Sequence, residues 1–304
     1  MDNRVLRQNA PHPIGPLLDP LRRRIRRLVR QLPAPLAEFI LFGLKQAWCC
    51  LFAGIMLGLL IVTKLIWSTD WALHRYDALF ISAIAIQVGF LYFKLESFEE
   101  AKVILIYHVV GTIMELFKTY MGSWSYPEAA IMKIGGVPLF TGFMYAAVGS
   151  YMARAIRIFD MRFSNYPPFW LTVALSLAIY VNFFTHHFAA DLRWALFAAT
   201  AALFWRVRIY FCVDAQIRWM PLLTAAFLTA LFLWIAENIG TATGTWIYPG
   251  QREWQSVSLQ KLGSWYLLLI ISFVLVTLVN RPRLPDVGER VGQARKKELL
   301  DEAI

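Results

Sequence analysis

The chain has 304 residues, of which 58% are hydrophobic and only 16% carry a charged side chain. A soluble chain of ordinary composition carries charge at about a quarter of its positions, so the composition excludes an ordinary soluble domain and predicts a polytopic membrane protein. The net charge of +10 does not indicate nucleic-acid binding. No recognition motif accompanies it, and the basic residues flank the apolar segments, where they orient membrane spans and meet anionic lipid.

The chain begins with a basic arm over residues 1–36, which is rich in proline and arginine. The arm is too polar to be a cleavable signal peptide. Its stretch "LRRRIRRLVR", at 21–30, has the pattern of a basic amphipathic helix that lies on a membrane surface. We therefore expect a cytoplasmic arm in contact with lipid head groups.

Eight segments then follow that are long and apolar enough to cross a bilayer, which takes about 20 mostly apolar residues. They are 40–66, 77–95, 102–121, 137–157, 169–187, 191–211, 219–239 and 263–280. A basic tail follows at 281–304. The sequence therefore predicts an all-α membrane bundle of eight transmembrane helices.

The basic residues in the short loops predict how these helices are oriented. The loops after the fourth and sixth spans carry three arginines each, whereas the loops on the opposite side carry one or two basic residues each. The six arginines are Arg154, Arg157, Arg162, Arg206, Arg208 and Arg218. We therefore expect both termini to be cytoplasmic, and the chain to lie in a bacterial inner membrane.

Two stretches share one pattern, "ELFKTYMGSWSYP" at 115–127 and "ENIGTATGTWIYP" at 237–249. Six of the thirteen positions are identical at a constant offset of 122 (237 − 115 = 122), and they read E-x3-T-x2-G-x-W-x-Y-P. Each stretch begins near the outer end of the third helix in a group of four. We therefore expect two parallel four-helix repeats, over 37–160 and 165–280, related by an axis along the membrane normal.

The two glutamates of this pattern, Glu115 and Glu237, fall inside apolar segments. An ionisable group there usually faces a polar cavity or a partner. If a repeat axis brings the pair together, burial and like charge keep one carboxyl protonated and the other ionised, so that one donates a proton and the other accepts one. The structural alternative pairs Glu115 locally with Lys118, and Glu237 with Asn238 or Thr241.

The neighbours of the glutamates extend the candidate site. On an ideal helix His108 shares a face with Glu115, and the second copy has no counterpart of His108 or Lys118. The candidate catalytic residues are therefore Glu115, Glu237, His108 and Lys118. The candidate substrate-binding residues are the threonines and aromatic residues of the pattern, for which interfacial anchoring is the alternative: Thr119, Thr241, Trp124, Trp246, Tyr126 and Tyr248.

A His-His-x3-Asp cluster, formed by His186, His187 and Asp191, falls between the fifth and sixth spans. Both metal binding and simple solvation remain open for it. The chain has no P-loop, no G-x-G-x-x-G before a strand and no aspartate-rich diphosphate motif. We therefore predict no cofactor and no bound metal.

Four runs carry a family resemblance: "FGLKQAWCC", "FKLESFEEAKVILIYHVVGTIMELFKTYMGSWSYPE", "GVPLFTGFMYAAVGSYMARA" and "AENIGTATGTWIYPGQ". They resemble a bacterial integral membrane family of unknown function, domain of unknown function eight-one-seven, over nearly all of 37–285. "ENIGTATGTWIY" and "GGVPLFTGFMYAAVGSYM" are also similar to carotenoid hydratases and small membrane lycopene cyclases, although here the pattern is divided between the two halves. That similarity implies carboxylates that protonate or hydrate isoprenoid double bonds.

Three functions follow from these observations. The first is an intramembrane enzyme that acts on a lipid or isoprenoid, with Glu115 and Glu237 as acid and base. The second is a small-molecule transporter with a site between the repeats, which glycine and proline located mainly at span ends disfavour. The third is a structural membrane protein. The expected partners are membrane lipids and a lipid or isoprenoid substrate, and no nucleic acid.

Overall fold

The computed structural model describes residues 20, 24–25, 27–29, 31–93, 95–96, 98–214, 216–251 and 255–279. The basic tail at 281–304 and residues 1–19 of the basic arm lie outside the described residues. The helices are α2 (Ala34–Cys49), α3 (Leu51–Ile66), α4 (Arg75–Tyr92), α5 (Phe98–Tyr120), α6 (Phe140–Ile158), α7 (Phe169–Thr185), α8 (Arg193–Phe204), α9 (Leu222–Ala242) and α10 (Leu259–Val279). The strands are β1 (Lys133–Ile134), β2 (Val137–Pro138), β3 (Arg162–Ser164), β4 (Arg208–Cys212) and β5 (Ile217–Pro221).

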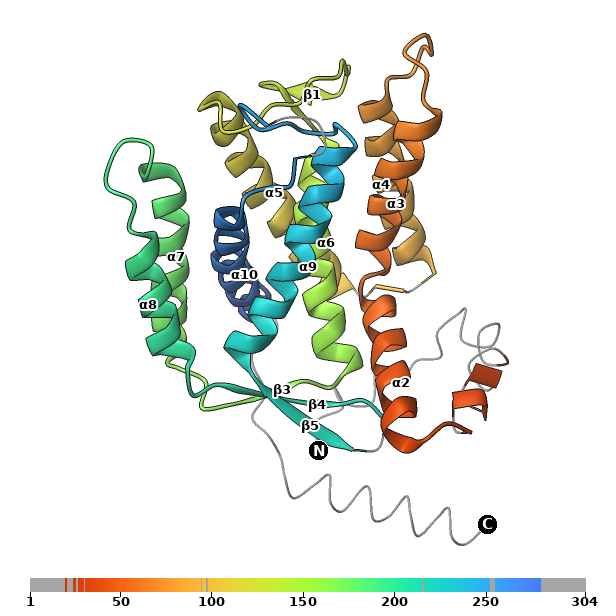
Figure 1. The fold of residues 1–304 in the computed structure, drawn as a ribbon, viewed down its shortest axis with the longest axis vertical. Helices are drawn as coiled ribbons and strands as arrows, with labels where there is room; N and C mark the ends of the chain where they lie inside the picture. The colour runs from red at the N-terminus through yellow and green to blue at the C-terminus, as the bar shows by residue number, and fades with distance from the viewer. Residues whose placement is uncertain are drawn as a thin grey trace, which may run out of the picture.

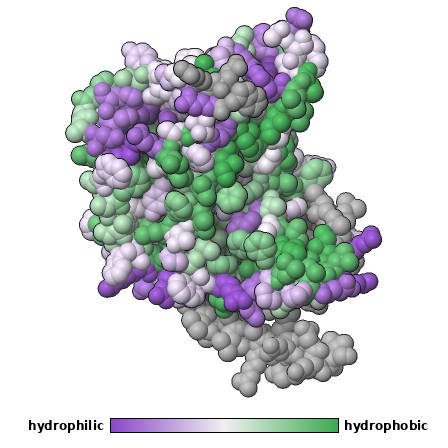
Figure 2. Space-filling model, in the orientation of Figure 1, coloured by the Kyte–Doolittle hydropathy of each residue, from purple (hydrophilic) through white to green (hydrophobic). Residues whose placement is uncertain are grey.

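The helices form a bundle in which successive elements from α3 to α10 run in alternating directions (Figure 1). The β1–β2 hairpin lies at one end of the bundle, together with the loops that follow α5 and α9. The antiparallel sheet β3–β4–β5 lies at the other end. On the face shown in Figure 2, hydrophobic residues occupy the middle of the molecule and hydrophilic residues gather toward its two ends.

Among the described helices, α5 over Ala101–Tyr120, α9 and α10 are long and apolar enough to cross a membrane. Helices α2 and α3 also satisfy this test as one span that is bent by 71° at its break. Helix α8 has 12 residues, which is only about 18 Å of helix against a hydrocarbon core of about 30 Å. The described helices therefore provide three or four candidate membrane spans.

Each of the eight segments that we predicted as spans contains a helix, but two of the predictions need correction. The first, 40–66, begins earlier, at Ala34, and is interrupted at Cys50, where α2 and α3 meet. The sixth, 191–211, ends as a helix at Phe204 and continues as the strand β4. Its residues alternate there between exposed and buried positions, and this period of two is the pattern of a strand.

The expectation of a helical fold is confirmed in the coarser sense that most described elements are helices, but the fold is not all-α, because the chain also forms two small sheets. The β1–β2 hairpin pairs Ile134 with Val137, within the segment that links α5 to α6. The second sheet pairs β3 with β4 and β4 with β5. These strands join α6 to α7 and α8 to α9, so the sheet links the two halves of the chain at one end of the bundle.

Helix α6 lies at the centre of the bundle, next to α5 (Figure 1). Small residues along it are buried and allow α5 to approach closely; they are Gly142, Ala146, Ala147, Gly149, Ser150 and Ala153. A Cβ atom at Gly149 would lie 2.8 Å from Cδ2 of Tyr107, so only glycine leaves room for that ring. Because α6 is surrounded by protein, its composition is less apolar than that of a helix facing lipid.

The two arginines that we assigned to the loop after the fourth span, Arg154 and Arg157, belong to α6. Arg154 is fully buried and forms an ion pair with Glu96 at 3.5 Å. Gln87 Nε2 donates a hydrogen bond of 2.6 Å to Glu96, and the Ser150 hydroxyl donates another. This polar cluster fixes α4, α6 and the segment before α5 to one another at the end of the bundle opposite β1.

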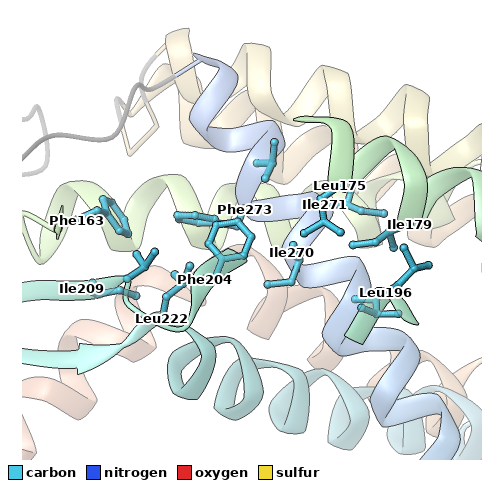
Figure 3. Packing of buried hydrophobic residues seen from close by; sticks show 13 residues of the cluster. Phe163, Leu175, Ile179, Leu196, Phe204, Ile209, Leu222, Ile270, Ile271 and Phe273 are labelled. Carbon is cyan, nitrogen blue, oxygen red and sulfur yellow. The ribbon is translucent and has the colours of Figure 1, made fainter. Parts of the chain in front are cut away.

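The largest hydrophobic cluster holds α7, α8 and α10 together (Figure 3). Phe163 and Ile209 enter it from the sheet, and Phe273 enters from α10. Ile179 of α7, which is fully buried, belongs to the same cluster and also lines the cavity described below. The cluster therefore sets the position of the α7 wall of that cavity.

Candidate functional site

Helices α5 and α9 end with the same turn. Gly122 and Gly244 follow them with φ of 68° and 63°, a left-handed conformation that glycine adopts without strain. The glycine amides bond to the carbonyl three residues earlier, at 3.0 and 2.9 Å, and the next amides bond to the carbonyl five residues earlier, at 2.9 and 3.0 Å. This is the Schellman motif in both places, and it turns each loop back over the end of its own helix.

The first loop returns its aromatic residues to Glu115. Trp124 Nε1 and the Tyr126 hydroxyl donate hydrogen bonds of 2.8 and 2.6 Å to Oε2 of Glu115. Glu115 and Tyr126 are both buried. We call Glu115, Trp124 and Tyr126 the first corner.

The second loop repeats this geometry with Glu237. Trp246 Nε1 donates a hydrogen bond of 2.8 Å to Oε1 of Glu237, and the Tyr248 hydroxyl donates another to the same oxygen. In both copies the tryptophan lies nine residues and the tyrosine eleven residues after the glutamate. We call Glu237, Trp246 and Tyr248 the second corner.

The two corners are in direct contact. The backbones of Ser125 and Ile247 exchange two hydrogen bonds of 3.0 Å each, and these residues have the same offset as the glutamates (247 − 125 = 122). Beside them the rings of Trp124 and Tyr248 meet edge to face, with centroids 6.1 Å apart. Residues at matching positions of the two stretches therefore bond to each other, and the two corners meet along this pair.

These contacts bear on the two structural alternatives considered from the sequence, which were interfacial anchoring of the aromatic residues and local pairing of the glutamates. The tryptophans and tyrosines of the pattern are bonded to the carboxylates, which is more than interfacial anchoring requires. Lys118 Nζ contacts two imidazoles, not Glu115. Asn238 bonds to Trp234 and Val257, and the Thr241 hydroxyl bonds to the backbone carbonyl of Glu237. The specific local pairs that we considered, Glu115 with Lys118 and Glu237 with Asn238 or Thr241, are therefore wrong.

Helix α4 supports both loops from one side. Arg75, which is buried at its first residue, forms an ion pair with Glu128 of the first loop. Its Nη2 donates a hydrogen bond of 2.8 Å to the Thr245 hydroxyl of the second loop, and the Tyr76 hydroxyl donates one of 2.7 Å to the Thr245 carbonyl. The relative position of the corners is thus fixed by α4 as well as by their own pairing.

A cavity of about 330 Å³ opens between α5, α6, α7, α9 and α10, and both glutamates line it. Its polar end is formed by the two corners, and its apolar wall includes Ile179, Leu233 and Leu268. Ligand pockets usually have volumes of about 300–1,000 Å³ and a few convergent polar groups on an apolar lining. The cavity has both properties.

The two carboxylates differ in how the protein occupies their oxygens. Glu115 receives a third hydrogen bond, of 2.7 Å, from the Tyr145 hydroxyl to Oε1, so both of its oxygens are engaged. The donors of Glu237, Trp246 and Tyr248, share Oε1, and the Trp265 indole lies beside this carboxylate. Oε2 of Glu237 therefore receives no hydrogen bond from Trp246 or Tyr248, and Trp265 is the further donor beside this carboxylate.

Three cationic side chains line the same cavity: Lys118, Lys261 and Arg193. Lys118 is 3% exposed, and its Nζ lies 3.3 and 2.9 Å from Nε2 of His186 and His187. Lys261 Nζ lies over the aromatic ring of Tyr248, 4.0 Å from its centroid. The end of the cavity nearest the loops therefore combines two carboxylates with three cations.

The histidines serve as neutral acceptors for Lys118. His186 Nδ1 lies 3.0 Å from the Asn182 carbonyl, which places a proton on Nδ1 and leaves Nε2 to accept from Lys118. Burial, together with the Lys118 charge, lowers the pKa of His186 and of His187. Both rings are therefore neutral at pH 7.

The third member of the candidate metal cluster points elsewhere. Asp191 accepts hydrogen bonds from Asn182 Nδ2 at 3.1 Å and from the Arg193 amide at 2.9 Å, and it forms an ion pair with the Arg193 side chain at 3.3 Å. Within the described ranges, no three or more His, Cys, Asp and Glu side chains are grouped to hold a metal ion.

Three candidates from the sequence do not line the cavity. His108 packs against Phe143, with ring centroids 4.9 Å apart, and its Nδ1 would lie 2.3 Å from a Cβ at Gly142. The Thr241 hydroxyl caps its own helix. Thr119 packs near the hairpin, where its Cγ2 would lie 3.6 Å from a Cβ at Gly136. The structure thus brings together Glu115, Glu237, Lys118 and the four aromatic residues of the pattern.

The asymmetry between the copies has a packing reason. The position of Lys118 in the first copy corresponds to Gly240 in the second. A Cβ at Gly240 would lie 2.0 Å from the Trp246 ring, so the second copy uses this position to seat its tryptophan. Only the first copy therefore supplies a cation from this position.

Sequence reasoning missed Tyr145, Trp265 and Arg193 as cavity residues, and used Lys261 only as a marker of the repeat. The sequence signal for Tyr145 is Gly111 within an apolar segment, since the structure shows that a Cβ at Gly111 would lie 2.6 Å from Cγ of Tyr145. A glycine within an apolar helix indicates that a neighbouring group approaches closely. It does not say which group.

Comparison with known proteins gives two findings. The model of a family described as "Protein of unknown function (DUF817)" matches residues 38–273. The "Uncharacterized protein YoaT" of Bacillus subtilis (strain 168) is 43% identical over 245 residues, which cover 80% of this chain and 92% of that protein. No solved structure matches the chain. Neither finding supports the similarity to carotenoid hydratases and lycopene cyclases.

Proposed function

The chain belongs to the DUF817 family, and we propose that it is an intramembrane enzyme that transfers protons to and from a lipid or isoprenoid by means of Glu115 and Glu237. The observation that carries this proposal is that both buried carboxylates line one cavity whose remaining wall is largely apolar. An apolar substrate chain can pack against that wall, and the two carboxylates can then reach one part of the chain.

The two carboxylates take different roles in the proposed reaction. Glu115, with three donors on its two oxygens, is held as the ionised partner. Glu237, whose Oε1 is bonded to Trp246 and Tyr248, exchanges the proton with the substrate through Oε2. Two carboxyl groups in different surroundings divide acid and base roles in this way.

A proton transfer of this kind suits an alkene. Addition of the Glu237 proton to one alkene carbon places positive charge on the neighbouring carbon, and loss of a proton from an adjacent carbon restores a double bond. The ionised Glu115 and the faces of Trp124, Trp246 and Trp265, which line the cavity, stabilise such a cation. The ionised Glu115 accepts the proton that the substrate loses, so the substrate gains and loses one proton. Exchange with solvent then returns Glu115 to its ionised form and Glu237 to its protonated form, and no further reactant is needed.

The proposed membrane arrangement has eight spans in two parallel four-helix repeats, over 37–160 and 165–280, with both termini cytoplasmic in a bacterial inner membrane. The alternating helix directions in Figure 1 support the eight spans. The matched corners and the reciprocal Ser125–Ile247 pair support the repeat. The helices that are too polar or too short to be candidate spans alone, such as α6 and α8, cross within the bundle beside the longer ones.

A transporter is the second candidate, because α2 and α3 form a broken helix bent by 71°. Broken helices line the sites of many transporters. The break at Cys50, however, contributes no residue to the cavity as described. A transporter would move its substrate unchanged across the membrane, and an enzyme would alter it.

The experiment that separates these functions compares lipid and isoprenoid extracts of a wild-type strain, a deletion strain and the deletion strain that expresses variants. We expect the deletion to change at least one extract component, and wild-type protein to restore it. Glu115→Gln and Glu237→Gln should insert normally and fail to restore it. Glu38→Gln is the matched control, since Glu38 pairs with Arg218 at the opposite end of the bundle.

Identical extracts from the wild-type and deletion strains would reject the enzyme. Restoration by both Gln variants would show that the carboxylates are structural. A component that is unchanged in amount but differs in its distribution across the membrane would instead identify a transporter.

A further inference from the structure

We propose that the substrate carries a phosphate head group, which binds among Lys118, Lys261 and Arg193 at the loop end of the cavity, while its apolar chain extends between α5, α9 and α10. This inference rests on the proposed function, because it names the substrate class of the same cavity.

Lys118 is the strongest indication of an anionic ligand. Its side chain is buried, and its Nζ contacts the two neutral imidazoles and the Phe183 ring, whose centroid lies 4.8 Å from Nζ. Within the described residues, no carboxylate lies within 4.0 Å of this ammonium group. Asp191 interacts with Lys118 only at longer range and is itself paired with Arg193. A buried cation without a counter-ion in contact is costly unless a ligand supplies one.

Lys261 and Arg193 extend this cationic surface. The Lys261 ammonium is held over the rings of Tyr248 and Trp124, at 4.0 and 5.4 Å from their centroids, with no carboxylate within 4.0 Å in the described ranges. Arg193 is aligned by its ion pair with Asp191. The three positive charges are close enough to repel one another, so an anion between them relieves that repulsion.

The number of cations favours a phosphate over a carboxylate. A phosphate ester presents three acceptor oxygens and a charge of about −1.5 to −2 at pH 7, enough to meet three cationic side chains together. A carboxylate presents two oxygens and one charge. Arginine and lysine are the side chains that proteins use to hold phosphate.

The apolar path for the chain continues below the head-group site. A second hollow of about 30 Å³ adjoins the cavity and shares with it Met114, Tyr145, Val148, Leu233, Trp265 and Leu268. Deeper in the bundle it is lined by apolar side chains, among them Val110 and Leu275. Glu115 and Glu237 lie along this path. When the phosphate is bound, the part of the apolar chain nearest the head group therefore lies beside the two carboxylates.

The test uses the full chain in dodecyl maltoside, with dodecyl phosphate as the probe. Trp124, Trp246 and Trp265 line the cavity, so their fluorescence reports binding. We expect saturable binding of dodecyl phosphate, at least tenfold tighter than dodecanol or dodecanoate. Lys118→Met removes the charge-assisted bonds from this side chain to the phosphate. It should weaken the binding of dodecyl phosphate about tenfold or more.

Lys261→Met provides a second, independent variant with the same expected loss, in case Lys118→Met does not fold. Lys64→Met is the matched control, because Lys64 is an exposed lysine near the outer end of α3 that does not line the cavity. It should bind dodecyl phosphate within twofold of the wild type. Equal binding of dodecanol or dodecanoate, or wild-type binding by both cavity variants, would overturn the proposal.

The two proposals fail separately. Glu237→Gln should bind dodecyl phosphate within a few-fold of the wild type while failing to restore the cellular extract. No preference for dodecyl phosphate, together with an extract that depends on Glu237, would remove the phosphate and leave the enzyme. If binding depends on the lysines but the extracts of the wild-type and deletion strains are identical, the head-group site would stand and the proposed catalysis would be rejected.

Discussion

Replacement of Gly240 by alanine tests whether the second corner is built as described. A Cβ at this position would lie 2.0 and 2.1 Å from Cη2 and Cζ2 of Trp246, far inside van der Waals contact. The ring cannot shift freely, because its Nε1 bonds to Glu237 at 2.8 Å. The Gly240→Ala chain must therefore move the indole and lose that bond.

The expected cost has two parts. Overpacking costs about 1–3 kcal/mol, and loss of a hydrogen bond to a protonated, neutral carboxyl adds about 0.5–1.5 kcal/mol. Together these costs amount to about 1.5–4.5 kcal/mol, and for a large domain each kcal/mol lowers the Tm by roughly 2–4 °C, so we expect a fall of roughly 3–18 °C. Thermal unfolding in detergent, followed by intrinsic fluorescence, measures it.

Gly89→Ala in α4 is the matched control, because a Cβ there would meet nothing within 4 Å. In a helix interior this change should be neutral, or stabilising by about 0.5–1 kcal/mol. A Gly240→Ala chain that melts within about 1 °C of the wild type would refute the packing of Trp246 on Gly240. Equal losses at both positions would show that the effect comes from the helix and not from the corner.

Three further predictions concern other parts of the structure. Ser125→Cys with Ile247→Cys should form a disulfide on oxidation, because a hydrogen-bonded antiparallel pair has Cα atoms about 5.5 Å apart; absence of the cross-linked peptide in mass spectrometry would contradict the loop pairing. Arg154→Met leaves Glu96 buried without its cation, so the free energy of unfolding, measured by denaturant titration, should fall by about 3–5 kcal/mol. A fall of less than about 1 kcal/mol would argue against the ion pair. Burial and the nearby lysine charge lower the pKa of His187, so the unfolded chain binds more protons than the folded one, and the free energy of unfolding should decline as the pH falls below about 6.5. His187→Gln should reduce this decline, measured as Tm from about pH 7 to 5. An unaltered Tm profile would exclude His187 as its source.

The positions of the helices could be predicted from the sequence, because long apolar runs have few alternatives to the helix. Where the prediction failed, local chemistry gave little warning. The break at Cys50 lies within the apolar stretch 47–62, which contains no proline and no charged residue. The end of α8 at Phe204 depends on pairing of β4 with strands from distant segments, which periodicity in one window does not reveal.

The candidate site could be predicted in part. The spacing in the two copies identified Glu115 and Glu237, and the repeat suggested that they meet. That the tryptophans and tyrosines return to the glutamates depends on the Schellman turns at Gly122 and Gly244. His108 shares the face of Glu115 but lies two turns along the helix, about 10 Å away. That two residues share a helix face does not mean that they lie at the same height along the helix. The structure places the His108 ring against Phe143 of α6.

The cations at the cavity could not be assembled from the sequence. Lys118, Arg193 and Lys261 come from three helices, and their convergence depends on the tertiary packing of α7, α8 and α10. The hydrophobic cluster that sets this packing draws its residues from both the sheet and these helices (Figure 3). No local pattern records that arrangement.

The most direct test of the central claim is transfer of a solvent proton to a lipid. Purified protein is incubated in D₂O with the lipid extract of the deletion strain, and the products are analysed by mass spectrometry. With wild-type protein we expect at least one lipid or isoprenoid to gain deuterium, and with Glu115→Gln or Glu237→Gln none. Deuterium gain that is equal in the wild type and both variants, or absent from all three, would contradict proton transfer by these two carboxylates.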